Sequence, residues 1–190
     1  MKTALTYGVA MAIAGAVLTL LLYFAGFHDS MEKMKSAQWI GTIGGSAIGV
    51  GGLALTMREK RAQSPDDAEW GYGSAFGAGV LAALFASLFG LVTAYVYFAI
   101  LNPGFSDVML QAQLAAMGEK GVPAAQVEKM EPMMRKWMSP IALTIMQGFA
   151  GFIWSVLLAF VVAIFFRRRP AGQTETALPT DVPPPLDGTG

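Results

Sequence analysis

The sequence predicts an all-α integral membrane protein: a four-helix bundle with an amphipathic, interfacial helical loop between its third and fourth spans. Two observations carry this prediction. Hydrophobic residues make up 54% of the chain and charged residues only 14%, against about 25% charged in soluble domains. Four long apolar runs contain no charged residue, and about 18 such residues cross the hydrocarbon core as a helix. The runs cover residues 4–27, 39–57, 74–101 and 141–166.

The first run follows Lys2 and could be read as a signal peptide. It is roughly 23 residues long and contains bulky residues at 20–23, whereas the apolar region of a signal peptide spans about 7–15 residues. We therefore expect a retained membrane helix.

Small residues recur at four-residue spacing in the first three spans, so that they share one helix face. Lipid tails provide no hydrophobic drive for helices to associate, so close backbone contact through small residues supplies the packing. We interpret these faces as the seams of a tight bundle or of an oligomer, with a glycine-lined pore as the alternative. The predicted packing positions are Gly8, Ala12, Gly41, Gly45, Gly49, Ala82, Ala86 and Gly90.

The connection 102–139, between the third and fourth spans, is the longest polar segment between spans. The Asn-Pro-Gly cluster at 102–104 should end the third span. A helix is expected over 107–118, and Pro123 suits the first position of a second helix, which Pro132 would kink or interrupt. The apolar residues of the second helix share a face, so we expect it to lie on the outer leaflet and lead into the fourth span.

The basic residues next to the spans indicate the orientation. The clusters at 58–61 and 167–169 adjoin span ends, where they favour the cytoplasmic side, and Arg135 and Lys136 argue the other way. We expect both termini in the cytoplasm. Residues 1–169 would form the four-span domain, and the Pro-rich residues 170–190 a disordered cytoplasmic tail.

The composition and motifs argue against most kinds of catalytic site and against ion-coupled transport. The chain has no cysteine, one histidine and a formal net charge of zero. It contains no catalytic triad motif, phosphate loop or HExxH sequence, and no ionisable side chain within the spans, where ion-coupled transporters keep one. We expect no enzymatic activity, no cofactor and no nucleic-acid partner. The expected partners are the lipid bilayer and either a second copy or another membrane protein.

Methionines in the loop give one candidate metal site. Thioether sulfur is a good Cu(I) ligand, and Met130, Met134 and Met138 would face the same compartment as His28. Methionine also fills uneven apolar contacts, and the spacing follows one face of the predicted helix. Packing is the favoured interpretation, with copper binding as the alternative.

Several strings resemble a known family. They are the opening residues 2–5 with Tyr7-Gly8, the motif at 71–76, the span-ending segment at 101–105, and the stretch from 126–128 through 134–140. In order and spacing the chain is similar to the domain-of-unknown-function 4199 family over residues 2–168. The resemblance implies a bacterial inner-membrane protein with four helices, and it implies no catalytic residues.

These observations favour a structural or interaction role, in which the protein is a scaffold or complex subunit. A passive small-solute or lipid-handling transporter is one alternative, although the few hydroxyl groups within the spans provide little of a polar path. Outer-face Cu(I) binding is the other alternative.

Overall fold

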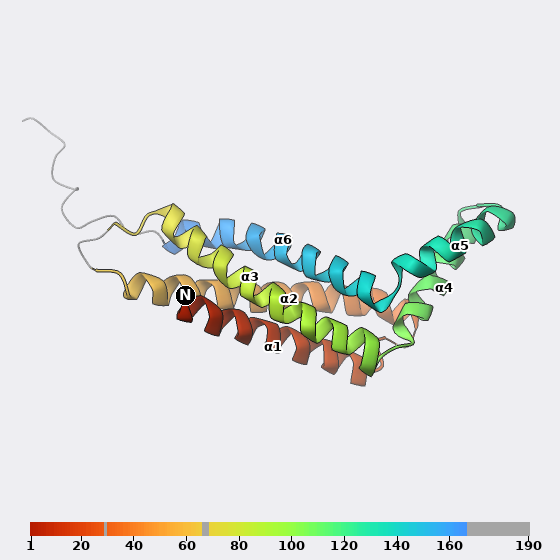
Figure 1. Cartoon of the computed structure of the whole chain (residues 1–190), viewed down its shortest axis with the longest axis horizontal. Coiled ribbons are helices and arrows are strands. Elements are labelled where there is room, and N and C mark those ends of the chain that lie inside the picture. Colours follow the sequence, from red (N-terminus) through yellow and green to blue (C-terminus); the bar gives the residue numbers. More distant parts are fainter. Residues whose placement is uncertain (29, 66–68, 167–190) are drawn as a thin grey trace, which may run out of the picture.

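The computed structural model describes residues 1–28, 30–65 and 69–166, and all regular structure within these ranges is helical. The predicted tail, 170–190, and the basic cluster 167–169 lie outside the described residues. In chain order the elements are α1 (Lys2–Phe24), α2 (Met31–Ala62), α3 (Tyr72–Val96), a single π-helical turn η1 (Tyr97–Leu101), α4 (Phe105–Glu119), α5 (Ala124–Trp137) and α6 (Pro140–Phe166) (Figure 1).

Four helices are long and apolar enough to cross a membrane: α1, α2, α3 continued by η1, and α6. This confirms the predicted all-α membrane bundle. The helix α2 has 32 residues and extends beyond the apolar run at both ends. The added residues at 31–38 and 58–62 include Glu, Lys, Arg and Met, which are favourable in helices, so the helix continues past its apolar centre.

The spans alternate in direction between two ends of the bundle. The N-terminus, the end of α2 and the start of α3 lie at one end, here called the terminal end (Figure 1). The start of α2 and the turn η1 lie at the opposite end, from which α4 and α5 emerge. We call α4 and α5 the arm and this second end the arm end.

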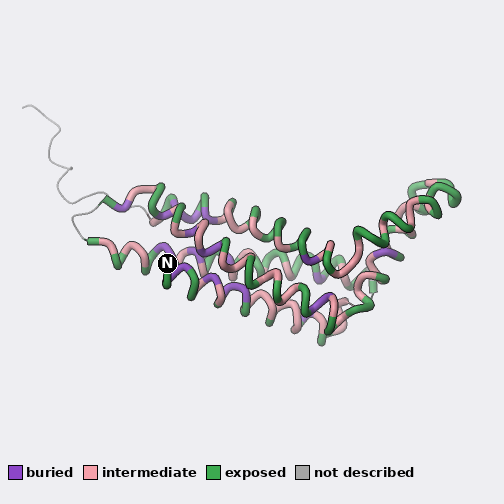
Figure 2. The backbone as a smooth tube through the Cα atoms, in the orientation of Figure 1, coloured by how far each residue is buried: buried purple, intermediate pink, exposed green. Residues whose placement is uncertain are grey.

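The helix α3 packs against both α1 and α6, and α2 contacts the same two helices. Half of the residues in the buried cluster are alanines, which allow the backbones to approach closely, as expected for membrane helices. The cluster lies in the half of the bundle nearest the terminal end, where buried segments gather in Figure 2. Its members are Ala4, Met11, Leu53, Met57, Trp70, Ala75, Ala82, Ala159, Val162 and Ala163.

Large apolar side chains cover the outside of the bundle. Phe24, Phe149 and Phe165 are among the most exposed. In water such a surface would be an aggregation hazard, whereas in a bilayer it contacts acyl chains, and the helices satisfy their own backbone hydrogen bonds. The exposure pattern is that of a membrane protein.

The arm is a pair of helices that projects beyond the bundle (Figure 1). Arg135 on α5 contacts the carboxylate of Asp107 on α4 at 3.3 Å and that of Glu131 at 3.2 Å. Near the base of α4, the side chain of Leu110 is buried. The helix α5 continues through Pro132, and Pro123 precedes it as the capping residue. Two helices were expected in this segment and two are present; their contact with the outer leaflet stays a prediction.

Candidate functional site

A single π-helical turn ends the third span. The backbone N–H of Asn102 donates to the carbonyl of Tyr97 at 2.8 Å, five residues back instead of four. The hydroxyl of Tyr23 on α1 donates to the nearby carbonyl of Leu101 at 3.3 Å. Single π turns within α-helices are frequent at functional sites, so this end of the bundle is the first candidate.

Tyr97 is the centre of a group of side chains that we call the arm-end cluster: Tyr23, His28, Tyr97, Asn102 and Phe105. Tyr97 is only 5% exposed. Its hydroxyl oxygen shares a hydrogen bond with Nδ1 of His28 and accepts another from the Asn102 side-chain amide at 2.9 Å. The rings of Tyr23 and Phe105 meet Tyr97 edge-on, at centroid distances of 5.8 and 6.1 Å.

The arm-end cluster joins two regions that are distant in sequence: the end of α1 with the α1–α2 turn, and the end of the third span with the first residue of α4. Edge-on aromatic pairs contribute about 0.5–1.5 kcal/mol beyond the area they bury. The polar atoms of His28, Tyr97 and Asn102 meet one another inside this aromatic surround. These hydrogen bonds and ring contacts are suited to fixing the position at which the arm leaves the bundle.

The candidate copper ligands belong to two separate elements. His28 lies in the arm-end cluster, with ring contacts to Tyr23, Tyr97 and Phe105. Met130 and Met134 are half-buried along α5, and Met138 follows directly after that helix. Within the described part of the chain, no three His, Asp or Glu side chains are grouped to hold a metal ion.

The predicted packing positions fall into two environments. A Cβ built on Gly8 would lie 2.6 Å from Cβ of Phe85 and 2.8 Å from the backbone oxygen of Ala82, so α1 and α3 meet there almost backbone to backbone. A Cβ on Gly49 would lie 3.1 Å from Leu158 of α6. Ala12 and Ala82 are buried, and Ala86 is half-buried beside Gly8.

The other glycines of these faces have more room. A Cβ on Gly41 would just reach Leu22, at 4.0 Å, and one on Gly45 or Gly90 would meet nothing within 4 Å. Gly45 is also exposed. All three lie in the half of the bundle nearest the arm end, where a Cβ on Gly148 would nevertheless collide with a leucine side chain of α3. The room is therefore a property of these positions and not of that half of the bundle.

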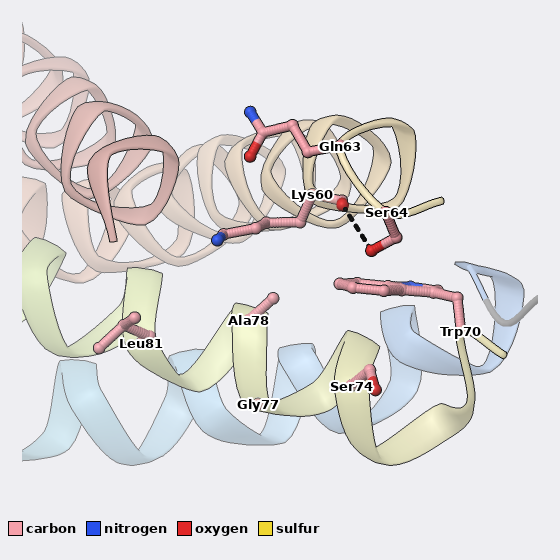
Figure 3. Close-up of a pocket in the computed structure, with 8 residues that line it drawn as sticks. All are labelled: Lys60, Gln63, Ser64, Trp70, Ser74, Gly77, Ala78 and Leu81. Atoms are coloured by element: carbon pink, nitrogen blue, oxygen red, sulfur yellow. Dashed lines mark hydrogen bonds between the residues drawn. The ribbon is translucent and has the colours of Figure 1, made fainter. Parts of the chain in front are cut away.

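A second candidate site lies at the terminal end. A cavity of about 400 Å³ separates the end of α2 from the start of α3. Its lining is polar on the α2 side and becomes apolar along α3, as the close-up in Figure 3 shows. We call it the terminal-end pocket; it is lined by Lys60, Gln63, Ser64, Trp70, Ser74, Gly77, Ala78 and Leu81.

Comparison with known proteins decides the family. Residues 6–168 match the model of the family described as protein of unknown function, DUF4199. The chain belongs to the DUF4199 family. No curated protein and no solved structure matches this DUF4199 chain. The match covers all four spans and the arm, and it confirms the resemblance found in the sequence.

Neither the arm-end cluster nor the terminal-end pocket was predicted as a site from the sequence of this DUF4199 chain. Tyr23 and Tyr97 lie within predicted apolar runs, and Phe105 and Trp70 lie just outside the ends of predicted spans. The available signals were tyrosines near the ends of two spans and a lysine and tryptophan flanking a short connection. Those signals show proximity to the headgroup layer and do not show which side chains meet.

Proposed function

We propose that this DUF4199 protein is a non-enzymatic structural subunit of the membrane that associates with further copies of itself through its arm. The observation that carries the proposal is the incomplete cover of the apolar face of α5. Met130 and Met134 on this face are half-buried, whereas Met133 is 55% exposed and Trp137 is 60% exposed. None of the residues of α5 is buried.

Helical spacing supports one continuous surface. Met130, Met133 and Trp137 are three and four residues apart, so their side chains neighbour one another on the helix. Exposed tryptophan beside flexible methionine is the composition that protein interfaces favour over other surfaces. The arm projects beyond the spans (Figure 1), which leaves this surface open to another molecule.

The charge of the arm favours a second copy as that molecule. Residues 105–138 contain four acidic and four basic side chains, so the segment has no net charge to draw it to an anionic bilayer or a strongly charged partner. Mixed charges of both signs suit a two-fold contact in which one patch meets itself. The arm surface is therefore assigned to self-association.

We also propose that the protein lies in a bacterial inner membrane with both termini in the cytoplasm and the arm outside. The support is the basic cluster at 58–61, next to the end of the second span. Because the chain lacks cysteine, a single Glu128→Cys change would report the side directly. An impermeant maleimide should label it in intact cells; labelling only after the membrane is opened would reverse the orientation.

Single-cysteine crosslinking in native membranes tests the self-association. Met133→Cys places a thiol on the open apolar face, and Glu128→Cys places one on the opposite face of the same helix as a matched control. We expect a crosslinked dimer from Met133→Cys and little from Glu128→Cys. Adding Trp137→Ala to Met133→Cys should reduce the dimer several-fold, because aromatic anchors carry much of an interface's binding energy.

Two results would overturn this function. Equal crosslinking at both positions would indicate random collision. No dimer from Met133→Cys, together with protection of its thiol from aqueous reagents, would place the apolar face against the bilayer instead of a second copy.

A further inference from the structure

Among the described residues, the terminal-end pocket presents a positive charge and a hydrogen-bond donor without a carboxylate. Lys60 supplies an ammonium group and Ser74 a hydroxyl, while the hydroxyl of Ser64 already donates to the carbonyl of Lys60. No Asp or Glu side chain is among its lining residues. Lys60 forms no ion pair with a carboxylate of the described residues. Such a lining suits an anion whose oxygens accept hydrogen bonds.

Trp70 forms an apolar wall of the pocket. The residue is only 8% exposed, and its indole nitrogen is enclosed, with almost no surface accessible to water. A group held in the open pocket therefore meets the ring of Trp70 and not its N–H. The polar contacts that the pocket offers are those of Lys60 and Ser74.

The direction of the Lys60 side chain strengthens this argument. Lysines near span ends usually extend toward water. Figure 3 shows Lys60 extending along α3 above Ala78 in the direction of Leu81, which are residues of the third span. A second positive charge lies close by, because a hydrogen bond with Lys60 and the charge of Lys60 lower the pKa of the Met1 amino group. Two neighbouring positive charges favour an anion at this end of the bundle.

The neighbouring polar groups hold this lining in place. Gln63 donates from its side-chain amide to Thr3 on α1 at 3.0 Å and to Glu59 at 3.1 Å. The hydroxyl of Ser64 donates to the carbonyl of Lys60 at 3.4 Å. Because the Gln63 amide is already used, Gln63 acts as a positioning residue that fixes the end of α2 against α1.

The shape of the pocket identifies the source of the anion. The polar groups are at the end of the bundle, at the depth of lipid headgroups, and the wall continues through Gly77 and Ala78 to Leu81. Ser74 and Leu81 are seven residues apart, or about 10 Å along a helix. A Cβ on Gly77 would meet nothing within 4 Å, which leaves room for an acyl chain along α3.

We propose that the terminal-end pocket binds the phosphate group of a phospholipid, with Lys60 as its counter-ion and Ser74 as a hydrogen-bond donor. The acyl chains of the lipid lie along the Gly77–Leu81 wall. The site is separate from the arm, so it stands or falls independently of self-association.

Native mass spectrometry of the full chain in mild detergent tests the site. The probes are phosphatidylglycerol, phosphatidylcholine, a diacylglycerol with the same acyl chains, and inorganic phosphate. We expect one phospholipid to bind saturably for either headgroup and the diacylglycerol to bind at least about tenfold more weakly, since hydrogen bonds to a charged group contribute about 1.5–3 kcal/mol. Inorganic phosphate alone should bind weakly.

Variants assign the binding to named residues. Lys60→Gln should weaken phospholipid binding about tenfold or more. Arg61→Gln removes the adjacent positive charge outside the pocket and should leave binding nearly unchanged. Ser74→Ala removes one hydroxyl on the surface of α3 and should weaken binding in protein that still elutes as a folded species. Trp70→Phe keeps a ring in the wall and removes only the enclosed N–H, so it should leave phospholipid binding nearly unchanged.

Three results would overturn the proposal. Equal affinity for the diacylglycerol would reduce the pocket to an apolar groove. Equal losses in Lys60→Gln and Arg61→Gln would reduce the effect to general attraction by basic residues. Inorganic phosphate binding as tightly as the phospholipid would replace the lipid by a soluble phosphate compound.

Discussion

The two halves of the bundle differ in how closely their backbones approach, although both use ring contacts and hydrogen bonds. Toward the terminal end, small side chains allow α1 and α3 to meet almost backbone to backbone at Gly8 and Ala82, and the Tyr72 ring and hydroxyl connect α3 to α6. Toward the arm end, a leucine side chain reaches the backbone at Gly148, and hydrogen bonds and ring contacts around Tyr97 connect the helices. The closest approach is between two backbones in the first half and between a side chain and a backbone in the second.

The difference also appears in how each end treats its polar groups. In the arm-end cluster, the Tyr97 hydroxyl meets His28 and Asn102. In the terminal-end pocket, Lys60 has no carboxylate partner among the described residues, and Ser74 presents its hydroxyl on the surface of α3. The first arrangement completes itself within the chain, whereas the second provides donors that another molecule can use. Close packing of a region and completeness of its hydrogen bonds are therefore independent properties.

The largest expected effect comes from filling the tight seam. Gly8→Leu would drive side-chain atoms into Phe85 and the backbone of Ala82, and overpacking of this kind costs about 3 kcal/mol. Gly15→Leu on the same helix is the control, because a Cβ there meets nothing within 4 Å. Thermal unfolding in mild detergent should show a large loss for the first variant only; equal losses would mean that the α1–α3 seam is not tight.

A smaller loss is expected when the arm-end cluster loses its central oxygen. Tyr97→Phe keeps the ring and removes the hydroxyl shared with His28 and Asn102, which should cost about 1–3 kcal/mol. Tyr95→Phe is the matched control two residues away, where the tyrosine is exposed. The arm should also exchange its amide hydrogens faster in Tyr97→Phe. Unchanged exchange would show that the cluster does not fasten the arm.

The smallest effect separates neighbouring glycines of one helix face. Gly45→Leu enters open space, and removing a glycine from a helix interior gains up to about 1 kcal/mol, so stability should stay equal or rise slightly. Gly49→Leu, one turn along, meets Leu158 and should destabilise. The measurement is the unfolding temperature of each variant in mild detergent. A lower unfolding temperature in Gly45→Leu would indicate that α2 is packed as tightly there as at Gly49.

Much of this architecture can be predicted from the hydropathy of the sequence. Each span coincides with an uncharged apolar run because a helix in lipid must be apolar along its length. The Asn-Pro-Gly cluster at 102–104 marked the start of the arm because it disfavours a continuing helix. Gly121, between the two arm helices, has a positive φ of 76°, a conformation that glycine adopts readily.

The candidate sites are less predictable because they depend on contacts between distant positions. Spacing puts Gly41, Gly45 and Gly49 on one face of α2, but it does not tell which of them a neighbour reaches. His28 and Tyr97 are 69 residues apart in sequence, and nothing in either local pattern pairs them. Trp70 follows the pattern of an interfacial ring, whereas its burial depends on how α2 ends beside it.

The π turn at the end of the third span has a consequence for insertions and deletions. Its hydrogen-bonded ring holds one residue more than an α-helical ring, and each residue turns a helix by about 100°. Removing one residue from Tyr97–Leu101 would let the segment return to α geometry without disturbing the span before it. Because the wider turn takes up the extra residue, the arm would keep about the same direction after such a deletion, whereas the same deletion inside a regular α-helical stretch would rotate everything downstream by about 100°. The base of the arm is therefore a place where the chain tolerates the loss of one residue.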